Sequence, residues 1–134
     1  MQLYGGMWHA VVANNTALRA QGFIIEGLNH GQHTYMPCYF VETLHNRVLE
    51  GVTYDGSVGG FAVSGYYNAS QPFTGAMAAA IVYRGNVGDN SAFSLNDAVT
   101  DVLYEDNALT NSDTGLTIRG NTSQRVFLRN NNDL

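Results

Sequence analysis

Apolar residues in this chain come in short runs, and nearly every run is bounded by Gly, Asn, Asp or Ser. Short apolar runs with turn-forming residues between them are typical of β-strands. Pairs such as Asp55-Gly56 and Gly85-Asn86 mark turns between the runs. Strands are therefore predicted at residues 7–12, 21–26, 34–43, 47–52, 60–64, 76–84, 99–104, 115–119 and 125–129.

Turn signals recur about every 8 to 15 residues, a spacing that favours a sandwich or a small barrel. The predicted fold is all-β, an antiparallel β-sandwich or jelly-roll-like domain. Residues 16–20 and 95–103 would also suit a helix, so we expect one short helix at most. The alanine-rich run at 76–80 continues into Ile81-Val82-Tyr83 and is interpreted as a buried strand.

The 134 residues fit one domain, 1–134, with a polar C-terminal tail. The chain has only two prolines and no linker-like tract, and no internal repeat is visible. The tail Asn130-Asn131-Asn132-Asp133 is expected to fray unless a neighbour covers it.

The chain contains no lysine, and only 13% of its residues are charged, while 45% are hydrophobic. Soluble domains have roughly 25% charged residues. Much of the surface must then be neutral, which suits a surface covered by neighbouring subunits. We therefore expect an oligomer, most simply a homotrimer, because a monomer would leave large apolar patches exposed.

A net charge of -5 argues against nucleic-acid binding, which requires a basic face. No apolar run is long enough for a signal peptide or a membrane span. We expect no membrane partner and synthesis in a host cytoplasm without a signal peptide.

Residues 29–45 hold the densest set of side chains of the metal-ligand type, including His30, His33, Cys38 and His45. Structural zinc usually takes two close pairs of ligands, and the second pair is missing here. We expect no metal and no cofactor, with His30 and His33 in a solvated turn; a site shared between subunits is the alternative. The acidic segment 101–113 lacks EF-hand spacing and is interpreted as a solvated loop, with a calcium loop as the alternative.

Cys38, Glu42 and His45 have the residue types of a nucleophile, an acid and a base. However, the flanking Tyr39-Phe40-Val41 run indicates a packed strand, in which a free cysteine acts as a small hydrophobe. No Gly-x-Ser-x-Gly motif occurs in the sequence, so no catalytic residues are predicted and the protein is not expected to be an enzyme.

Two groups of residues are candidates for partner binding. Arg119, Arg125 and Arg129 are the only clustered cations, and they would bond to a partner's acids. Tyr66 and Tyr67 stand beside Asn68, a combination of aromatic ring and amide that suits sugars.

From Tyr39 to Tyr67 the order of residues resembles the trimeric jelly rolls of the tumour-necrosis-factor and complement globular-head kind. The shared features are an apolar strand with Leu44-His45-Asn46, then Tyr54-Asp55-Gly56-Ser57, Phe61 and Gly65-Tyr66-Tyr67. The family's proline and its closing Gly-Phe strand are absent. The resemblance implies a homotrimer with apolar side chains on the threefold axis, and it assigns no binding residues.

A lysine-free β-protein rich in Asn, Gly and Tyr is interpreted as a structural subunit of a viral (phage) particle. A capsid decoration or head/tail accessory protein is the first expectation, with other virion proteins and its own copies as partners. A receptor-binding or lectin-like knob that recognises surface glycans is the alternative.

Overall fold

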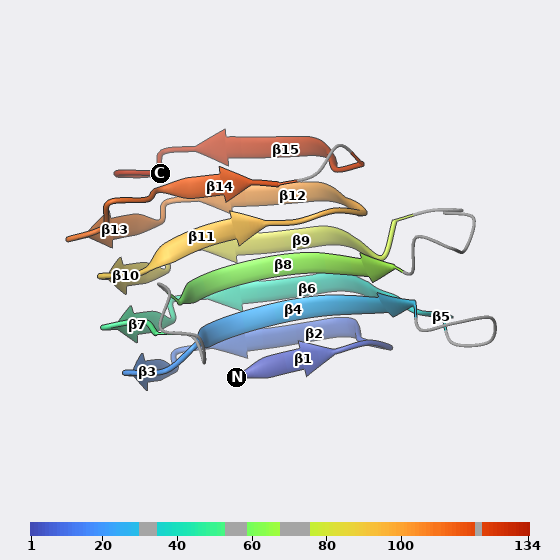
Figure 1. Ribbon diagram of the computed structural model, residues 1–134, viewed down its shortest axis with the longest axis horizontal. Coiled ribbons are helices and arrows are strands. Elements are labelled where there is room, and N and C mark those ends of the chain that lie inside the picture. The colour runs from blue at the N-terminus through green and yellow to red at the C-terminus, as the bar shows by residue number, and fades with distance from the viewer. Residues whose placement is uncertain (30–34, 53–58, 68–75, 120–121) are drawn as a thin grey trace.

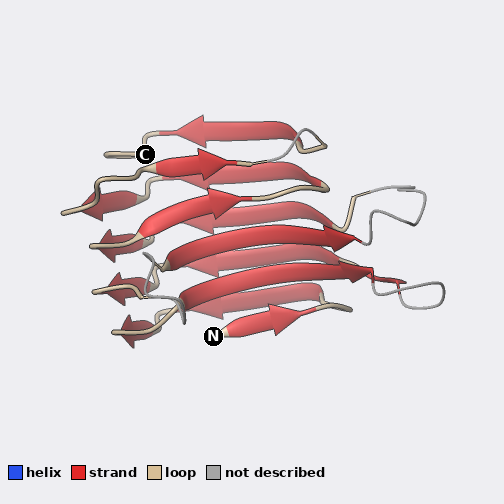
Figure 2. Ribbon diagram, viewed as in Figure 1, coloured by secondary structure: helices blue, strands red, loops and turns tan. Residues whose placement is uncertain are grey.

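The computed structural model describes residues 1–29, 35–52, 59–67, 76–119 and 122–134 (Figure 1). Within these residues the regular secondary structure consists of strands joined by turns, with no helix (Figure 2). The strands are β1 (Gln2–Tyr4), β2 (Trp8–Ala13), β3 (Thr16–Leu18), β4 (Gly22–Asn29), β5 (Tyr35–Met36), β6 (Cys38–Leu44), β7 (Arg47–Leu49), β8 (Gly60–Tyr67), β9 (Ala78–Arg84), β10 (Val87–Asp89), β11 (Ala92–Leu95), β12 (Val99–Glu105), β13 (Ala108–Thr110), β14 (Leu116–Ile118) and β15 (Gln124–Arg129).

The strands form three parallel sheets around one core (Figure 1). Sheet A has the order β1-β4-β8-β11-β14, sheet B the order β15-β12-β9-β6-β2, and sheet C the order β13-β10-β7-β3. The chain visits the sheets in the sequence A, B, C and then returns to A, so that each circuit lies on the one before it. This is a β-solenoid, or parallel β-helix, and among its described strands only the short strand β5 pairs in the antiparallel sense, with β4.

The expected antiparallel sandwich or jelly roll is therefore wrong, although the all-β character is right. Jelly-roll topology, which the resemblance to trimeric jelly rolls implied, is also absent. The two segments considered for a helix are strands instead: 16–20 contains β3, and 95–103 lies across the end of β11 and most of β12. The reason is that short apolar runs between turns suit both architectures, and successive runs here stack along an axis instead of folding back as hairpins.

Three columns of residues with left-handed backbone mark the bends of each circuit. The residues within a column occupy equivalent places in successive circuits, and all have φ between +45° and +63°. The column in sheet B is His9, Phe40, Ala80, Asp101 and Arg125; the column between sheets B and C is Asn14, His45, Gly85, Asp106 and Asn130; the column between sheets C and A is Arg19, Glu50, Asn90 and Asn111. Since this conformation costs roughly 1–2 kcal/mol for most residues, its recurrence shows that the stacked circuits impose it.

An asparagine ladder follows the second of these columns. Asn46 Oδ1 accepts hydrogen bonds from both the backbone N–H and the Nδ2 of Asn15, each at 3.0 Å. The same pair of bonds joins Asn46 to Asn86, Asn86 to Asn107 and Asn107 to Asn131. Each Nδ2 also donates to a backbone carbonyl of sheet B, and the acceptors are Ala13 for Asn15, Val12 for Asn46, Thr43 for Asn86, Tyr83 for Asn107 and Tyr104 for Asn131. The ladder satisfies buried backbone groups at the corner where the chain leaves sheet B.

The spacing of the ladder explains why no repeat is visible in the sequence. Consecutive ladder asparagines are 31, 40, 21 and 24 residues apart. The circuits therefore differ in length, and no fixed period is present in the sequence.

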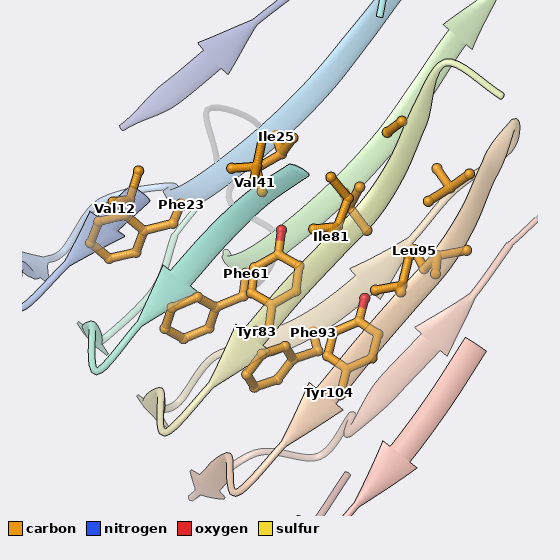
Figure 3. Packing of buried hydrophobic residues seen from close by; sticks show 14 of the residues in the cluster. Val12, Phe23, Ile25, Val41, Phe61, Ile81, Tyr83, Phe93, Leu95 and Tyr104 are labelled. Atoms are coloured by element: carbon orange, nitrogen blue, oxygen red, sulfur yellow. The ribbon is translucent and has the colours of Figure 1, made fainter. Parts of the chain in front are cut away.

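Aromatic rings stack in the core along the solenoid axis (Figure 3). Phe61 lies between Phe23 and Phe93, with ring centroids 5.6 and 4.8 Å apart, and Tyr83 stacks on Tyr104 at 5.2 Å. The parallel pairing of β4, β8 and β11 places the phenylalanines opposite one another. The rings are thus held at about the spacing of neighbouring strands.

The two stacked tyrosines give a matched pair of predictions. Tyr83 donates a hydrogen bond to the carbonyl of Ala62 at 2.7 Å, whereas the hydroxyl of Tyr104 is buried without a partner among the described residues. Burial raises the pKa of both phenols. We expect Tyr83→Phe to destabilise the fold by about 1 kcal/mol, because a hydrogen bond is lost, and Tyr104→Phe to stabilise it by a similar amount. Urea unfolding of both variants measures the difference, and equal effects of the same sign would contradict this account.

Candidate binding surfaces

The outer face of sheet B carries a groove of about 370 Å³. Its walls come from four strands of the sheet, β2, β6, β9 and β12, with one residue from β15. The lining residues are His9, Ala10, Val11, Phe40, Glu42, Ala80, Ile81, Val82, Asp101, Leu103 and Phe127. The left-handed column of sheet B crosses this groove and gives it its shape.

Phe40, Ala80 and Asp101 follow one another along that column, on β6, β9 and β12. The ring of Phe40 stacks on His9, with centroids 4.8 Å apart and planes at 7°. Ala80 offers only a methyl group at the next place. The column therefore has an aromatic wall, then a gap, and then the carboxylate of Asp101.

Asp101 is held by an arginine on the side away from the gap. Arg125 donates to Asp101 through Nε at 2.6 Å and through Nη2 at 2.5 Å. These hydrogen bonds, together with the charge of Arg125, lower the pKa of Asp101 below its ordinary value. Asp101 is consequently an ionised, positioned hydrogen-bond acceptor at neutral pH.

A second depression of about 470 Å³ lies on the outer face of sheet A. Ser64, Ser94 and Thr117 line it with Arg119 at one end. Its floor consists of small side chains and backbone, such as Gly60 and Ala92, without an exposed ring. The depression thus has hydroxyl groups but no aromatic wall.

Of the candidate arginines, two lie on the same strand and the third lies elsewhere. Arg125 and Arg129 both belong to β15, and each is paired with an acid of β12, Asp101 or Glu105. Arg119 follows β14 on the sheet A side, where its backbone N–H donates to the carbonyl of Leu95. Arg125 and Arg129 are thus engaged within the chain.

The candidate tyrosines Tyr66 and Tyr67 are the last residues of β8, paired with Leu28 and Asn29. Their side chains lie outside the described part of the structure, and so do His30 and His33. In the described ranges there is no group of three or more His, Cys, Asp or Glu side chains that could hold a metal ion.

Cys38 is fully buried, as expected from its flanking run. Burial raises the pKa of its thiol, which also donates to the carbonyl of Glu26 at 3.4 Å. Glu42 belongs to the groove on the outer face, and His45 is exposed beyond the end of β6. The three residues considered for nucleophilic catalysis therefore do not converge.

The two ends of the solenoid are the remaining candidate surfaces. At the C-terminal end, Ile118 and Leu128 continue the core positions of Leu95 and Tyr104, yet they are 52% and 56% exposed. At the other end, β1, β2 and β3 each have a paired strand on one side only among the described strands. Each end thus presents strand edges and core-facing apolar side chains.

The asparagine ladder gives the two ends opposite polarity. At one end, Asn15 Oδ1 receives no hydrogen bond from the described residues. At the other end, the backbone N–H of Asn131 donates none. One end thus offers an acceptor where the opposite end offers a donor.

Sequence reasoning missed the groove and the ends. The groove depends on the left-handed column of sheet B. Its members share no residue type, so nothing in the sequence marks the column; they are His9, Phe40, Ala80, Asp101 and Arg125. The signal for the ends was the ladder, hidden by unequal circuit lengths.

Among the described residues no helix is long and apolar enough to cross a membrane.

Comparison of the chain with protein-family models, with curated proteins and with solved structures found no match.

Proposed function

We propose that this chain is a structural, non-enzymatic subunit of a larger assembly, and that the assembly is a virion, with the chain as a capsid decoration or head/tail accessory protein. The observation that carries the assembly role is the pair of uncovered solenoid ends. Repeat folds need a polar cap at each terminal repeat to stay soluble as monomers. Ile118 and Leu128 are apolar where a cap would be polar.

The two ends are complementary to each other. If the C-terminal end of one copy contacts the N-terminal end of another, the N–H of Asn131 can donate to Oδ1 of Asn15 and extend the ladder by one rung. In the same register, Leu128 would cover Val12, and Ile118 would cover Leu3, because these residues occupy the same core columns. A head-to-tail contact of this kind is heterologous and builds rows of subunits unless another protein closes them.

The composition supports the same function. With 13% charged residues and no lysine, little of the surface is strongly hydrated. Exposed apolar side chains and strand edges are typical of surfaces that pair with another chain. The virion is proposed because a low-charge, lysine-free surface suits a subunit that other chains cover in a large assembly.

Light scattering combined with size-exclusion chromatography tests the contact. We expect the wild-type protein to associate as its concentration rises, and we expect Leu128→Asp to dissociate it, because the new carboxylate would be buried in the contact. The control is Phe127→Asp, since Phe127 is 55% exposed on the neighbouring, outward-facing position of the same strand. A wild-type protein that stays monomeric at high micromolar concentration would contradict the assembly role.

If the wild-type protein is a homotrimer and Leu128→Asp remains trimeric, the subunits do not meet through the solenoid ends. That result would still agree with the trimer expected from composition. The virion is tested separately, by immunogold labelling of purified particles of the virus that encodes the chain. Particles without label, from cells in which the protein is abundant, would exclude a virion subunit.

A further inference from the structure

We infer that the groove on sheet B binds one pyranose ring of a neutral glycan, in the gap between Phe40 and Asp101. The gap is defined by the left-handed column of sheet B, and Ala80 forms its floor. This binding function is independent of the assembly through the solenoid ends, because the groove lies on the side of the solenoid.

Phe40 provides a fixed aromatic wall. One face of its ring is covered by His9, and Trp8 packs edge-on against it with centroids 5.3 Å apart. On its other side the column continues with Ala80, which leaves the second face of the ring toward the gap. An aromatic face held in this way suits the C–H face of a sugar, which is apolar.

The gap has the size of one ring. Neighbouring strands are roughly 4.8 Å apart, so the places of Phe40 and Asp101, with β9 between them, are separated by about 9.6 Å. A ring one strand spacing from Phe40 would lie over Ala80 and repeat the 4.8 Å stacking of His9 on Phe40. Its edge would then reach the carboxylate of Asp101.

The polar groups of the groove select for hydrogen-bond donors. Asp101 and Glu42 are acceptors when ionised. Because Arg125 already neutralises Asp101, neutral hydroxyl or amide donors suit this site better than a second cation. Anionic sugars would be repelled by Glu42.

The apolar part of the groove favours an acetamido sugar. Val82, Leu103 and Phe127 line the groove beside the gap. The methyl group of an N-acetyl substituent can pack on these side chains while its N–H donates to a carboxylate. We therefore expect N-acetylglucosamine to bind better than glucose.

Trp8 makes the test direct, because it is the only tryptophan of the chain and contacts Phe40. The wild-type protein is titrated with tri-N-acetylchitotriose and with cellotriose, and the emission of Trp8 is followed. We expect a saturable change with both, and at least severalfold tighter binding of the acetylated sugar. No saturable change with either sugar up to about 10 mM, a concentration that detects even a binding free energy of roughly −3 to −4 kcal/mol, would overturn the inference.

Two substitutions of Ala80 test whether the sugar binds in the gap or elsewhere on the surface. Ala80→Asn fills the gap without backbone strain, since asparagine tolerates the φ of +55°. Ala80→Gly keeps the gap open and tolerates the same φ. We expect Asn to reduce affinity at least tenfold and Gly to leave it within about twofold of wild type, with circular dichroism showing that both fold. Equal affinity of the two variants would overturn the assignment of the gap.

Calorimetry on Phe40→Ala tests the aromatic wall without relying on Trp8. A loss of about tenfold is expected from the stacking contribution of one ring. Tyr4→Ala is the control, because Tyr4 is 50% exposed on sheet A. An unchanged affinity of Phe40→Ala would overturn the inference, as would binding of a tri-arginine peptide in place of both sugars, which would indicate a basic protein partner.

Discussion

Asn86→Ala is expected to destabilise the fold by about 3–4 kcal/mol. Asn86 is fully buried, accepts two hydrogen bonds from Asn46, and donates through Nδ2 to Thr43 O and Asn107 Oδ1. Truncation leaves the buried Asn46 N–H without its acceptor, at a cost of about 1–3 kcal/mol, and removes the Nδ2 hydrogen bonds to Thr43 O and Asn107 Oδ1, each worth about 1 kcal/mol. The free energy of unfolding in urea measures the effect.

Asn15→Ala is the matched control, because Asn15 stands at the end of the ladder and is only half-buried. Its loss should cost about 1 kcal/mol, since water can reach the groups that it leaves. Asn86→Asp keeps the shape of the side chain and its acceptor oxygen, but it places a carboxylate oxygen against Thr43 O and Asn107 Oδ1. We expect it to lower the free energy of unfolding about as much as Asn86→Ala does. If Asn86→Ala costs no more than Asn15→Ala, the ladder does not stabilise the interior circuits.

Phe61→Ala is expected to destabilise the fold by about 3–5 kcal/mol, the cost of removing a buried phenylalanine from a packed core. Phe61 is fully buried between Phe23 and Phe93, and its edge faces Tyr83 at 6.3 Å. The cavity would interrupt the stack in the middle of the solenoid, where the neighbouring circuits cannot collapse into it without breaking their pairing. Chemical unfolding followed by circular dichroism provides the measurement.

Phe61→Leu should cost only about 1–1.5 kcal/mol, because most of the volume is kept. Phe127→Ala is the surface control, and we expect a loss below about 1 kcal/mol at this exposed ring. Similar losses for Phe61→Ala and Phe127→Ala would show that the aromatic stack does not determine stability.

The positions of most longer strands could be predicted from the sequence. The expected strand at 7–12 is β2, that at 60–64 lies within β8, and that at 76–84 contains β9. These predictions succeeded because alternating burial and bounding turns are local signals. The burial of Cys38 was predicted for the same reason.

The sequence by itself determined that this chain is all-β and where most of the longer strands lie, since both depend on neighbouring residues. Only the tertiary structure decided which strands pair. Whether Val87–Asp89 joins a hairpin or stacks on Arg47–Leu49 depends on residues 40 positions away. The groove was also decided at that level, because Phe40, Ala80 and Asp101 become neighbours only when three circuits of different length lie in register. Short β-strands carry no local signal for parallel or antiparallel partners, and the ladder that fixes the register is formed by residues 21 to 40 positions apart.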